Sequence, residues 1–504
     1  MVKYTSSKQL SFEEFETHLG KPLDGHNRWV LLASQIPWDE LATIYARSLR
    51  SDFGRPSVDA RVVIGAMLIK HIKSLTDEET IEEIRENPYM QYFLGLKEFV
   101  YDRIFDPSLF VTLRKRMGLS VFDQMTDAFM KKIATVKQAK QSKNDTSKKQ
   151  APTDSTDNVK DNVSAATSCS SDKNKGLLLI DASVAPQDIT YPTDLDLLNS
   201  CREHTERLID ELYQPSPGKR KPRTYRQKAR QDYLASARKR KKSGKMMRKA
   251  IRKQLNYVNR NIKTIHTLLD SNLQSLTSRS LRRFWVIQEI YRQQKEMYDN
   301  RSHRISGRIV SVSQPHVRPI VRGKSGKDVE FGAKISASVV DGFAFVDRIS
   351  WDAYNESADL KAQVEKYYKR YGYYPVAVLA DQIYGTRANR DYLKSKGIRF
   401  SGKPLGRPAK LSKEKKRALR KEARLRNRIE GKFGEGKRKY DLDLVKAKTL
   451  TTSESWIAAV FFVMNIAHWL RVCFFASFFR WLIIQISRIF KELFYYKLQY
   501  GMNF

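Results

Sequence analysis

The sequence predicts an α/β fold preceded by an all-helical N-terminal domain, and three patterns carry this prediction. Two short apolar runs, at residues 177–181 and 376–381, each end in a carboxylate and are typical of buried central strands. An Asp-Gly dipeptide at 341–342 separates two further strand-like runs, as in a hairpin whose turn needs two residues with positive φ. Residues 1–135, in contrast, carry apolar helical segments, one of which starts with the acidic residues 77–79.

The charge of the chain indicates an anionic partner. Its 504 residues include 93 Lys and Arg against 55 Asp and Glu, which gives a formal net charge of +38 at pH 7. A compact chain with that charge repels itself, and nucleic acid or an anionic membrane surface is the usual partner that relieves the repulsion. Because 41% of the residues are hydrophobic, most of the chain should still form a globular core.

The three cysteines, Cys169, Cys201 and Cys473, stand far apart and in no CxxC spacing. This pattern argues against a disulfide-stapled secreted domain and against the common zinc-finger arrangements. The first residues of the chain also lack the apolar core of a signal peptide. We therefore expect a reducing compartment and a cytoplasmic protein.

The helical N-terminal domain, residues 1–135, is expected to be a compact bundle that either binds DNA ends or mediates dimerisation. Residues 136–175 differ from it in composition. From residue 137 to 175 the chain contains no Leu, Ile, Met or aromatic residue, so this segment cannot bury enough apolar surface to order itself. We expect a disordered linker that separates the N-terminal domain from the rest of the chain.

The α/β domain is expected at residues 176–199 and 301–470, interrupted by a basic helical insertion at 200–300. Between residues 219 and 253 this insertion contains 17 Lys or Arg and one acid. The elements expected in the α/β domain are a strand, a hairpin, a helix, two strands and two helices, at residues 177–181, 331–340, 343–349, 357–370, 376–381, 398–401, 403–428 and about 451–470. This order predicts a ribonuclease-H-like mixed sheet.

The segment 471–504 is an apolar, aromatic tail. A membrane-spanning helix needs about 20 consecutive apolar residues. Polar or charged side chains interrupt every window of that length here, namely Asn465, His468, Arg471, Arg480 and Arg488. We expect core packing or a subunit contact rather than a membrane anchor.

Asp181 and Asp381 end the two apolar runs and are candidate metal ligands. In a ribonuclease-H-like sheet these two strands are neighbours, so the two carboxylates would lie side by side although they are 200 residues apart. Carboxylates this close repel each other unless a divalent cation lies between them. Oxygen-only ligands near phosphate suit Mg²⁺, with Mn²⁺ as a substitute.

A third carboxylate is expected from a basic helix. Arg426 and Glu430 share one helical face, and Lys437 joins them if the helix continues through three intervening glycines. One acid for metal, flanked by two cations for phosphate, suits phosphoryl transfer. Glu435 is an alternative third acid that does not fit the spacing to Arg426 and Lys437.

These motifs resemble those of bacterial insertion-sequence transposases of the DDE class, in the broad group called insertion sequence four and five. The segments that carry the resemblance are 54–57, 86–93, 179–183, 330–334, 379–385 and the Arg-x3-Glu-x6-Lys spacing at 426–437. In that family a Tyr usually stands three residues before the Arg, where this chain has Ala423. The departure weakens the match to the subgroup that uses the Tyr, but it leaves the metal site intact.

The resemblance implies a DNA transposase that cleaves the terminal inverted repeats of its own insertion sequence and transfers the strands to a target. Asp181, Asp381 and Glu430 would be its catalytic residues and would hold two Mg²⁺ ions, one activating water and later the 3′-hydroxyl, the other stabilising the leaving oxygen. Arg426 and Lys437 would bind DNA phosphate. The alternative is a catalytically inactive, transposase-derived DNA-binding protein.

The partners expected on this basis are double-stranded DNA at the element ends and at the target, and a second copy of the chain in a homodimeric active complex. No small-molecule cofactor is expected, and a membrane partner is not favoured. The location would be the cytoplasm, in association with the nucleoid. Within the basic insertion, which the resemblance places beside the active site, the expected phosphate-binding residues are Lys239, Arg240, Lys241 and Lys242.

Overall fold

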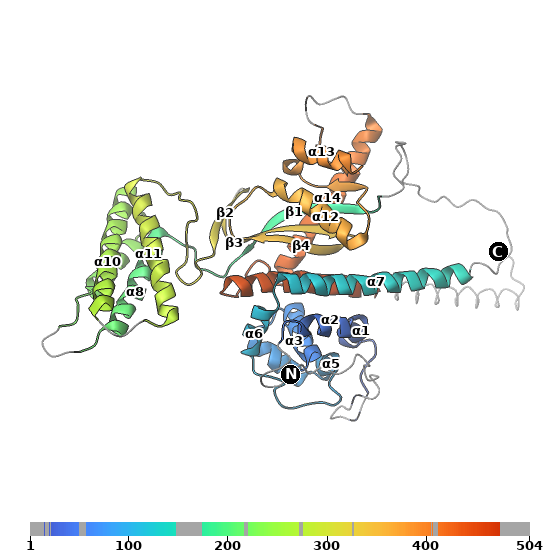
Figure 1. Ribbon diagram of the computed structural model, residues 1–504, viewed down its shortest axis with the longest axis horizontal. Helices are drawn as coiled ribbons and strands as arrows, with labels where there is room; N and C mark the ends of the chain where they lie inside the picture. The colour runs from blue at the N-terminus through green and yellow to red at the C-terminus, as the bar shows by residue number, and fades with distance from the viewer. Residues whose placement is uncertain are drawn as a thin grey trace, which may run out of the picture.

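The computed structural model describes residues 15, 20, 22–49, 57–147, 174–215, 220–271, 276–324, 327–404, 406 and 412–473. Most of the predicted linker, at 148–173, and most of the predicted tail, at 474–504, lie outside the described residues. The described chain forms an N-terminal helical bundle, a sheet covered by helices, and a separate helical lobe (Figure 1).

Seven helices lie in the described part of the N-terminal region: α1 Arg28–Gln35, α2 Trp38–Ala46, α3 Ala60–Lys73, α4 Asp77–Glu86, α5 Pro88–Phe93, α6 Leu109–Arg116 and α7 Leu119–Ser147. A capping box starts α4, because the Thr76 hydroxyl accepts from the backbone N–H of Glu79 and the Glu79 carboxylate accepts from the backbone N–H of Thr76. Asn87 caps α5, whose first residue is Pro88. The helical character expected for this region is therefore observed.

Helix α7 ends at Ser147, twelve residues beyond the boundary predicted between the bundle and the linker. The absence of large apolar residues after residue 136 predicts a loss of packing there, but it does not prevent helix formation. Lys, Gln and Ala, which dominate residues 137–143, are strong helix formers. The helix thus continues into the segment that was expected to be disordered.

The sheet contains β1 Leu177–Pro186, β2 Arg318–Lys324, β3 Lys327–Val340, β4 Phe343–Ser350, β5 Ala377–Leu379 and β6 Arg399–Phe400. Its strand order is β2-β3-β1-β5-β6, and β4 also pairs with β3. Strand β1 is antiparallel to β3 and parallel to β5, and β5 is parallel to β6. The mixed sheet expected from the sequence is therefore present.

The predicted hairpin joins β3 to β4. Asp341 and Gly342 form its turn with φ of 50° and 85°, which are the two positive values that an Asp-Gly hairpin turn requires. Strand β2 is absent from the elements predicted from the sequence. It pairs with the first part of β3, and Pro319 near its start weakens the strand signal, because proline cannot donate a ladder hydrogen bond.

The helical elements around the sheet are η1 Glu356–Asp359, α12 Leu360–Tyr371, η2 Gln382–Tyr384, α13 Arg387–Ser395, α14 Lys413–Lys439 and the apolar helix Leu450–Cys473. The apolar helix is capped by Thr449, whose hydroxyl and backbone N–H exchange hydrogen bonds with Thr452 at 3.4 and 3.2 Å. The cap therefore lies two residues before the helix start expected at about residue 451.

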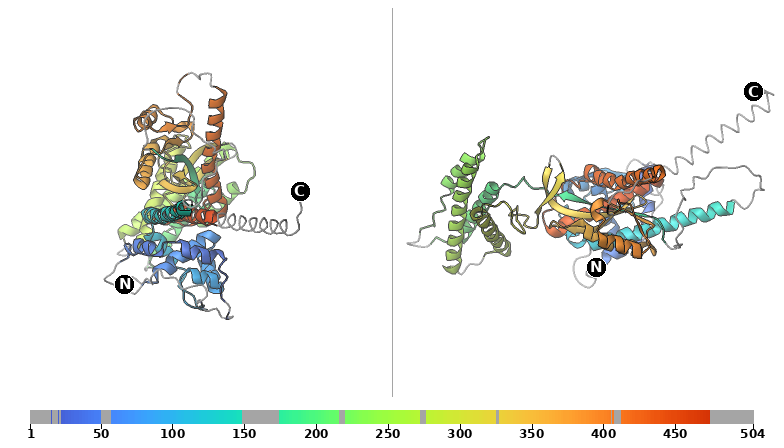
Figure 2. Two further views of the ribbon diagram at one scale, coloured as in Figure 1. Left: turned by 90° about the vertical axis from the view of Figure 1, so that its right-hand side faces the viewer. Right: turned by 90° about the horizontal axis from the view of Figure 1, so that it is seen from above.

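The basic insertion forms its own helical lobe from α8 Asp194–Leu212, α9 Arg226–Ala237, α10 Gly244–Ser271 and α11 Ser278–Asp299. Its buried side chains, among them Leu198, Ile209 and Val258, form a hydrophobic core separate from that of the rest of the protein. Helix α8 starts six residues before the predicted boundary at residue 200. The lobe stands apart from the sheet in both Figure 1 and the top view of Figure 2.

The N-terminal bundle shares one hydrophobic core with the α/β domain. The ring of Phe462, on the apolar helix Leu450–Cys473, packs against Phe122 and Phe129 of α7 with centroids 6.1 and 6.2 Å apart. The Asn465 side chain of the same helix bonds both the N–H and the C=O of Ala344 in β4 at 2.8 Å. The bundle is therefore docked onto the sheet domain, although the sequence predicted a separate domain on a linker (Figure 2).

The helix Leu450–Cys473 is long and apolar enough to cross a membrane by length and composition, and among the described residues it is the one such helix. Within it, 67% of the most apolar window is buried inside the protein. Its apolar faces contact α7 and the sheet. The expectation of core packing or a subunit contact for residues 471–504 falls almost entirely outside the described residues and stays a prediction.

Candidate active site

The register between β1 and β5 brings Asp181 and Asp381 to the same place in the sheet. The pairs Leu177 with Ala377 and Leu179 with Leu379 are each separated by 200 residues, and so are the two aspartates that follow. Asp381 lies just after β5, as expected, where its Oδ1 accepts from the backbone N–H that starts η2 at 2.7 Å.

Asp181 lies inside β1 rather than at its end, which corrects the prediction from the sequence. The strand continues to Pro186, because residues 182–186 pair with β3. The Asp181 carboxylate accepts a hydrogen bond from the backbone N–H of Ala182 at 2.8 Å. The neighbouring position of the two aspartates is unaffected by this difference.

Helix α14 supplies the third carboxylate. It runs without a break through Gly431, Gly434 and Gly436, so the condition for placing Lys437 on the same face as Glu430 is met. Ile429 and Phe433 are buried and hold this part of the helix on the protein core, whereas Glu430 is exposed. The structure therefore directs Glu430 away from the packed face.

A cavity of about 580 Å³ brings the predicted residues together. Asp181, Asp381, Glu430 and Lys437 all line it, and they come from β1, the end of β5 and α14. Arg426, one turn before Glu430, reaches the site by donating from Nη1 to Oδ1 of Asp381 at 3.0 Å. All five residues predicted for the catalytic site and its flanking cations thus meet at one place.

The negative charges at this cavity oppose one another. Burial raises the pKa of Asp181 to about 6, and the charges of Glu356, Glu430 and Asp381 add to the rise, while the hydrogen bond from Ala182 opposes it. The anionic form of Asp181 is therefore disfavoured in the absence of a cation. A bound divalent cation would relieve this repulsion.

The donor set fits a hard divalent cation, since Asp181, Asp381 and Glu430 offer only carboxylate oxygens. No group of three or more His, Cys, Asp or Glu side chains within the described part of the chain is already arranged around a metal position. Arg426 pairs with an oxygen of Asp381 at 3.0 Å. The chemistry of the three carboxylates suits a divalent cation, and a protein cation borders them.

Glu435, the alternative third acid, lies outside this cavity. It forms ion pairs with Lys432 at 3.1 Å and with Arg471 of the apolar helix. These cations lower the pKa of Glu435, although burial opposes the effect. Its position ties α14 to the helix Leu450–Cys473 and separates it from Asp181.

Two residues of the cavity were not predicted as site residues. Lys334 on β3 and Glu356 at the start of η1 line it and form an ion pair of 2.8 Å between Nζ and Oε2. Lys334 falls in the segment 330–334 that carried part of the family resemblance, so a signal for it existed. Glu356 had no signal, because it looks like an ordinary acidic residue in the first turn of a helix.

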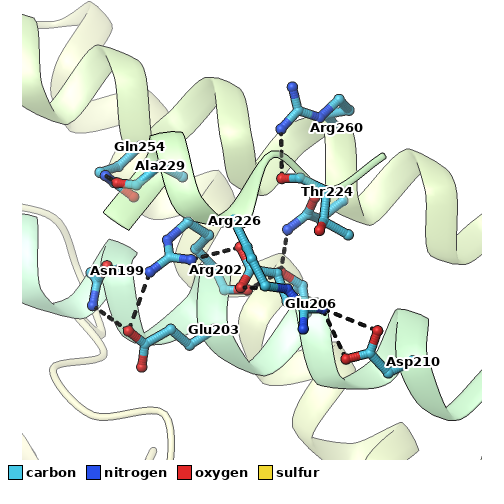
Figure 3. A network of polar contacts seen from close by, with 12 residues as sticks. Asn199, Arg202, Glu203, Glu206, Asp210, Thr224, Arg226, Ala229, Gln254 and Arg260 are labelled. Carbon is cyan, nitrogen blue, oxygen red and sulfur yellow. Dashed lines mark hydrogen bonds and ion pairs between the residues drawn. The ribbon is translucent and has the colours of Figure 1, made fainter. Parts of the chain in front are cut away.

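The basic run of the insertion divides into two groups. Several of its cations are neutralised inside the lobe, where Lys221 and Arg226 pair with Asp210 at 2.6 and 2.8 Å and Lys253 pairs with Asp232 at 2.6 Å. Figure 3 shows part of this network around Arg202, a buried residue of α8 whose guanidinium donates to Glu206 at 2.6 Å and to Asn199 at 2.7 Å. These charges hold the lobe together.

The second group lies in the connection between α9 and α10. It contains the four predicted phosphate-binding residues, which are exposed and which form no ion pair with any residue that the structure describes: Lys239, Arg240, Lys241 and Lys242. The cavity around Asp181 includes no residue from this connection. The structure therefore places these four cations in the lobe, apart from the carboxylates.

Two family models match the chain. A "Transposase domain (DUF772)" matches residues 17–116, which cover most of the N-terminal bundle, and a "Transposase DDE domain" matches residues 378–467, which include Asp381 and Glu430. Both matches support an insertion-sequence transposase of the DDE class. This family generally uses divalent metal ions. Assignment to the group called insertion sequence four and five stays a prediction.

One curated relative is similar over a short stretch. The "Uncharacterized protein ORF8 in nfe locus" of Rhizobium meliloti is 32% identical over 114 residues, which are 23% of this chain and 55% of that protein. The chain thus spans about half the length of this relative. No solved structure matches the chain.

Proposed function

We propose that this DDE transposase is an active enzyme that performs metal-dependent cleavage and strand transfer at the terminal inverted repeats of its own insertion sequence. The observation that carries the proposal is the convergence of Asp181, Asp381 and Glu430, from three distant chain segments, on one cavity. The strand order β4-β3-β1-β5-β6, with β3 antiparallel and β1, β5 and β6 parallel, supports a ribonuclease-H-like core around these residues.

Asp181, Asp381 and Glu430 would bind divalent cations, with Mg²⁺ as the physiological ion and two ions in the complete site. Bound there, the cations would supply an activated water or 3′-hydroxyl and stabilise the leaving oxygen of an in-line displacement. Arg426 and Lys437 border the carboxylates and would hold the phosphates on either side of the scissile bond. The ion pair of 3.0 Å between Arg426 and Asp381 supports this role for Arg426.

The surrounding parts would bind DNA. The exposed cations at 239–242 would contact phosphates without reading sequence, because such contacts are the same at every base pair. The docked N-terminal bundle would bind element ends or join two copies in a homodimer. The substrates are double-stranded DNA ends and target DNA, and the protein would act in the cytoplasm at the nucleoid.

The test is cleavage of a duplex that carries an element end by the full chain in Mg²⁺. Asp181→Asn, Asp381→Asn and Glu430→Gln should each abolish cleavage and leave DNA binding nearly unchanged, because the carboxylates hold cations rather than the duplex. Glu435→Gln is the matched control on the same helix, and it should retain cleavage. Cleavage at the wild-type rate by any of the first three variants would remove that residue from the site.

The same assay separates the proposal from its alternative. If the wild-type chain binds the end-containing duplex but cleaves it in neither Mg²⁺ nor Mn²⁺, the chain is an inactive DNA-binding relative of the transposases. The presence of all three acids around one cavity favours the active enzyme.

A further inference from the structure

The cavity holds a second pair of opposite charges besides Asp381 and Arg426. The Nζ of Lys334 lies 2.8 Å from Oε2 of Glu356 and donates to the backbone C=O of Tyr354 at 2.8 Å. Both charged side chains are largely buried, with 16% and 20% of their surfaces exposed. An ion pair this enclosed has to be balanced by its surroundings, because desolvation of both charges costs several kcal/mol.

Glu356 faces Asp181 across the cavity. Among the acids whose charge opposes ionisation of Asp181, Glu356 acts most strongly, ahead of Glu430 and Asp381. Glu356 therefore belongs to the same group of opposing negative charges as Glu430 and Asp381, and it lines the same cavity. Lys334 compensates only one of the two facing carboxylates, since within the described chain no cation is paired with Asp181.

An unpaired polar group lies beside the same two carboxylates. Tyr384 is fully buried, and its hydroxyl has no hydrogen-bond partner among the described residues. Burial raises the pKa of this phenol, and the charges of Glu356 and Asp181 are the largest further causes. A buried hydroxyl without a partner is costly, and here it lies within the influence of the same two negative charges.

We propose that Glu356 is a fourth cation-binding carboxylate of the site, opposite Asp181, and that Lys334 is its counter-ion while no cation is bound. This inference rests on the proposed function, because it extends the same metal site. A divalent cation between Asp181 and Glu356 would neutralise both carboxylates. Lys334, released from Glu356, would then be free to contact a DNA phosphate.

The first experiment locates the cation in the wild-type chain. Fe²⁺ bound in place of Mg²⁺, with ascorbate and peroxide, produces hydroxyl radicals that cut the backbone close to the metal. The proposal expects cuts around residues 354–358 together with cuts near Asp181. Cuts near Asp181 and Asp381 without any at 354–358 would overturn it. Because this readout needs no variant, it does not depend on the folding of a mutant.

The second experiment measures Mn²⁺ binding by the loss of the free-ion signal in electron paramagnetic resonance, without DNA. Glu356→Gln should weaken binding about tenfold or more. The matched control is Glu365→Gln on α12, whose carboxylate accepts from Tyr374 and Tyr392 outside the cavity and which should bind as the wild type does. Lys334→Met should tighten binding several-fold, because it removes the competing counter-ion.

The outcomes separate this inference from the proposed function. If Asp181→Asn loses Mn²⁺ binding while Glu356→Gln retains it, the fourth ligand is refuted and the three-acid site stands. If neither variant changes Mn²⁺ binding, the metal site itself is wrong and both proposals fail. Weaker binding by a folded Lys334→Met variant, with unchanged circular dichroism, would refute the counter-ion role.

Discussion

Neutralising the four exposed cations at residues 239–242 should flatten the salt dependence of DNA binding. The structure leaves all four without an ion pair among the described residues, so each is free to replace a counterion on a phosphate. Each phosphate contact contributes about −0.9 to the slope of log K against log salt, so a Gln substitution at all four positions should reduce that slope by up to about 3.6. Between 50 and 200 mM salt the wild-type chain should then lose on the order of 100-fold more affinity than the variant.

The assay is fluorescence anisotropy of a labelled duplex titrated with full-length protein at five or more salt concentrations. Lys221, Arg226 and Lys253 provide the control, because the same run of sequence contains them but each is engaged in an ion pair within the lobe. Their replacement by Gln should change the slope little. It should lower the free energy of unfolding of the lobe instead, by at most about 1 kcal/mol for each pair.

Equal slopes for the wild type and the variant at 239–242 would refute the reasoning, because they would mean that these side chains remain solvated in the complex. A larger change in slope for the paired residues than for the exposed ones would contradict the division of the run into structural and DNA-binding cations. A duplex with an element end and a duplex without one should give the same change in slope, since phosphate contacts carry no sequence information.

Three further changes test the fold around the site. In the absence of metal, Asp181→Asn should make the chain more stable above pH 6 and leave its stability unchanged below pH 4. The pKa of Asp181 in the folded chain, about 6, exceeds the ordinary value of 3.8, so the wild type loses stability as pH rises between these two values. Urea unfolding of both proteins above pH 6 and below pH 4, without metal, measures the difference. Gly332→Ala should lower the free energy of unfolding by about 1–3 kcal/mol and slow cleavage, because the added Cβ would lie 2.0 Å from the carbonyl oxygen of Ala185. Unchanged urea unfolding and unchanged cleavage would contradict this. Phe462→Ala should lower the free energy of unfolding by about 3–5 kcal/mol. The bundle and the sheet should still unfold together when followed by circular dichroism and by tryptophan fluorescence. Two separate transitions in the wild type would argue against a shared core.

The pairing of Asp181 with Asp381 was predictable because it follows from local patterns. Each aspartate follows an apolar run, and parallel strands in register preserve a constant offset along their length. The extension of β1 beyond Asp181 was not predictable in the same way. Residues 182–186 end in Pro186 and lie beyond the apolar run, and their extended conformation depends on pairing with the distant strand β3.

Glu430 was predictable from spacing, whereas Glu356 was not. The distances from Arg426 to Glu430 and Lys437 are a property of one helix, so periodicity alone selects Glu430 over Glu435. Glu356 reaches the cavity only through the tertiary packing of η1 against η2, the segment that follows Asp381. An acidic residue at the start of a helix is common, and nothing in its neighbours along the chain marks it as a site residue.

The docking of the N-terminal bundle was missed although one signal for it exists. Helix α3 is buried over nearly its whole length from Ala60 to His71, and a helix that is apolar on all sides must be enclosed by other elements. The run of apolar residues at 62–69 therefore indicates more packing partners than a small isolated bundle provides. The partner, the helix Leu450–Cys473, lies nearly 400 residues away, beyond the reach of any local pattern.

This docking gives the proposed site a fixed relation to the bundle. Ser74, at the end of α3, donates from its hydroxyl to the backbone C=O of Lys439 at 2.9 Å, at the last residue of the helix that carries Glu430. On the same helix Gly436 lies so close to Met464 that a Cβ there would be 3.1 Å from its sulfur, which locks α14 against the apolar helix. An element end bound by the bundle would consequently be held at a constant distance from the carboxylates. The place of the cut would then depend on the packing of the bundle against the α/β domain rather than on the length of the segment at 148–173.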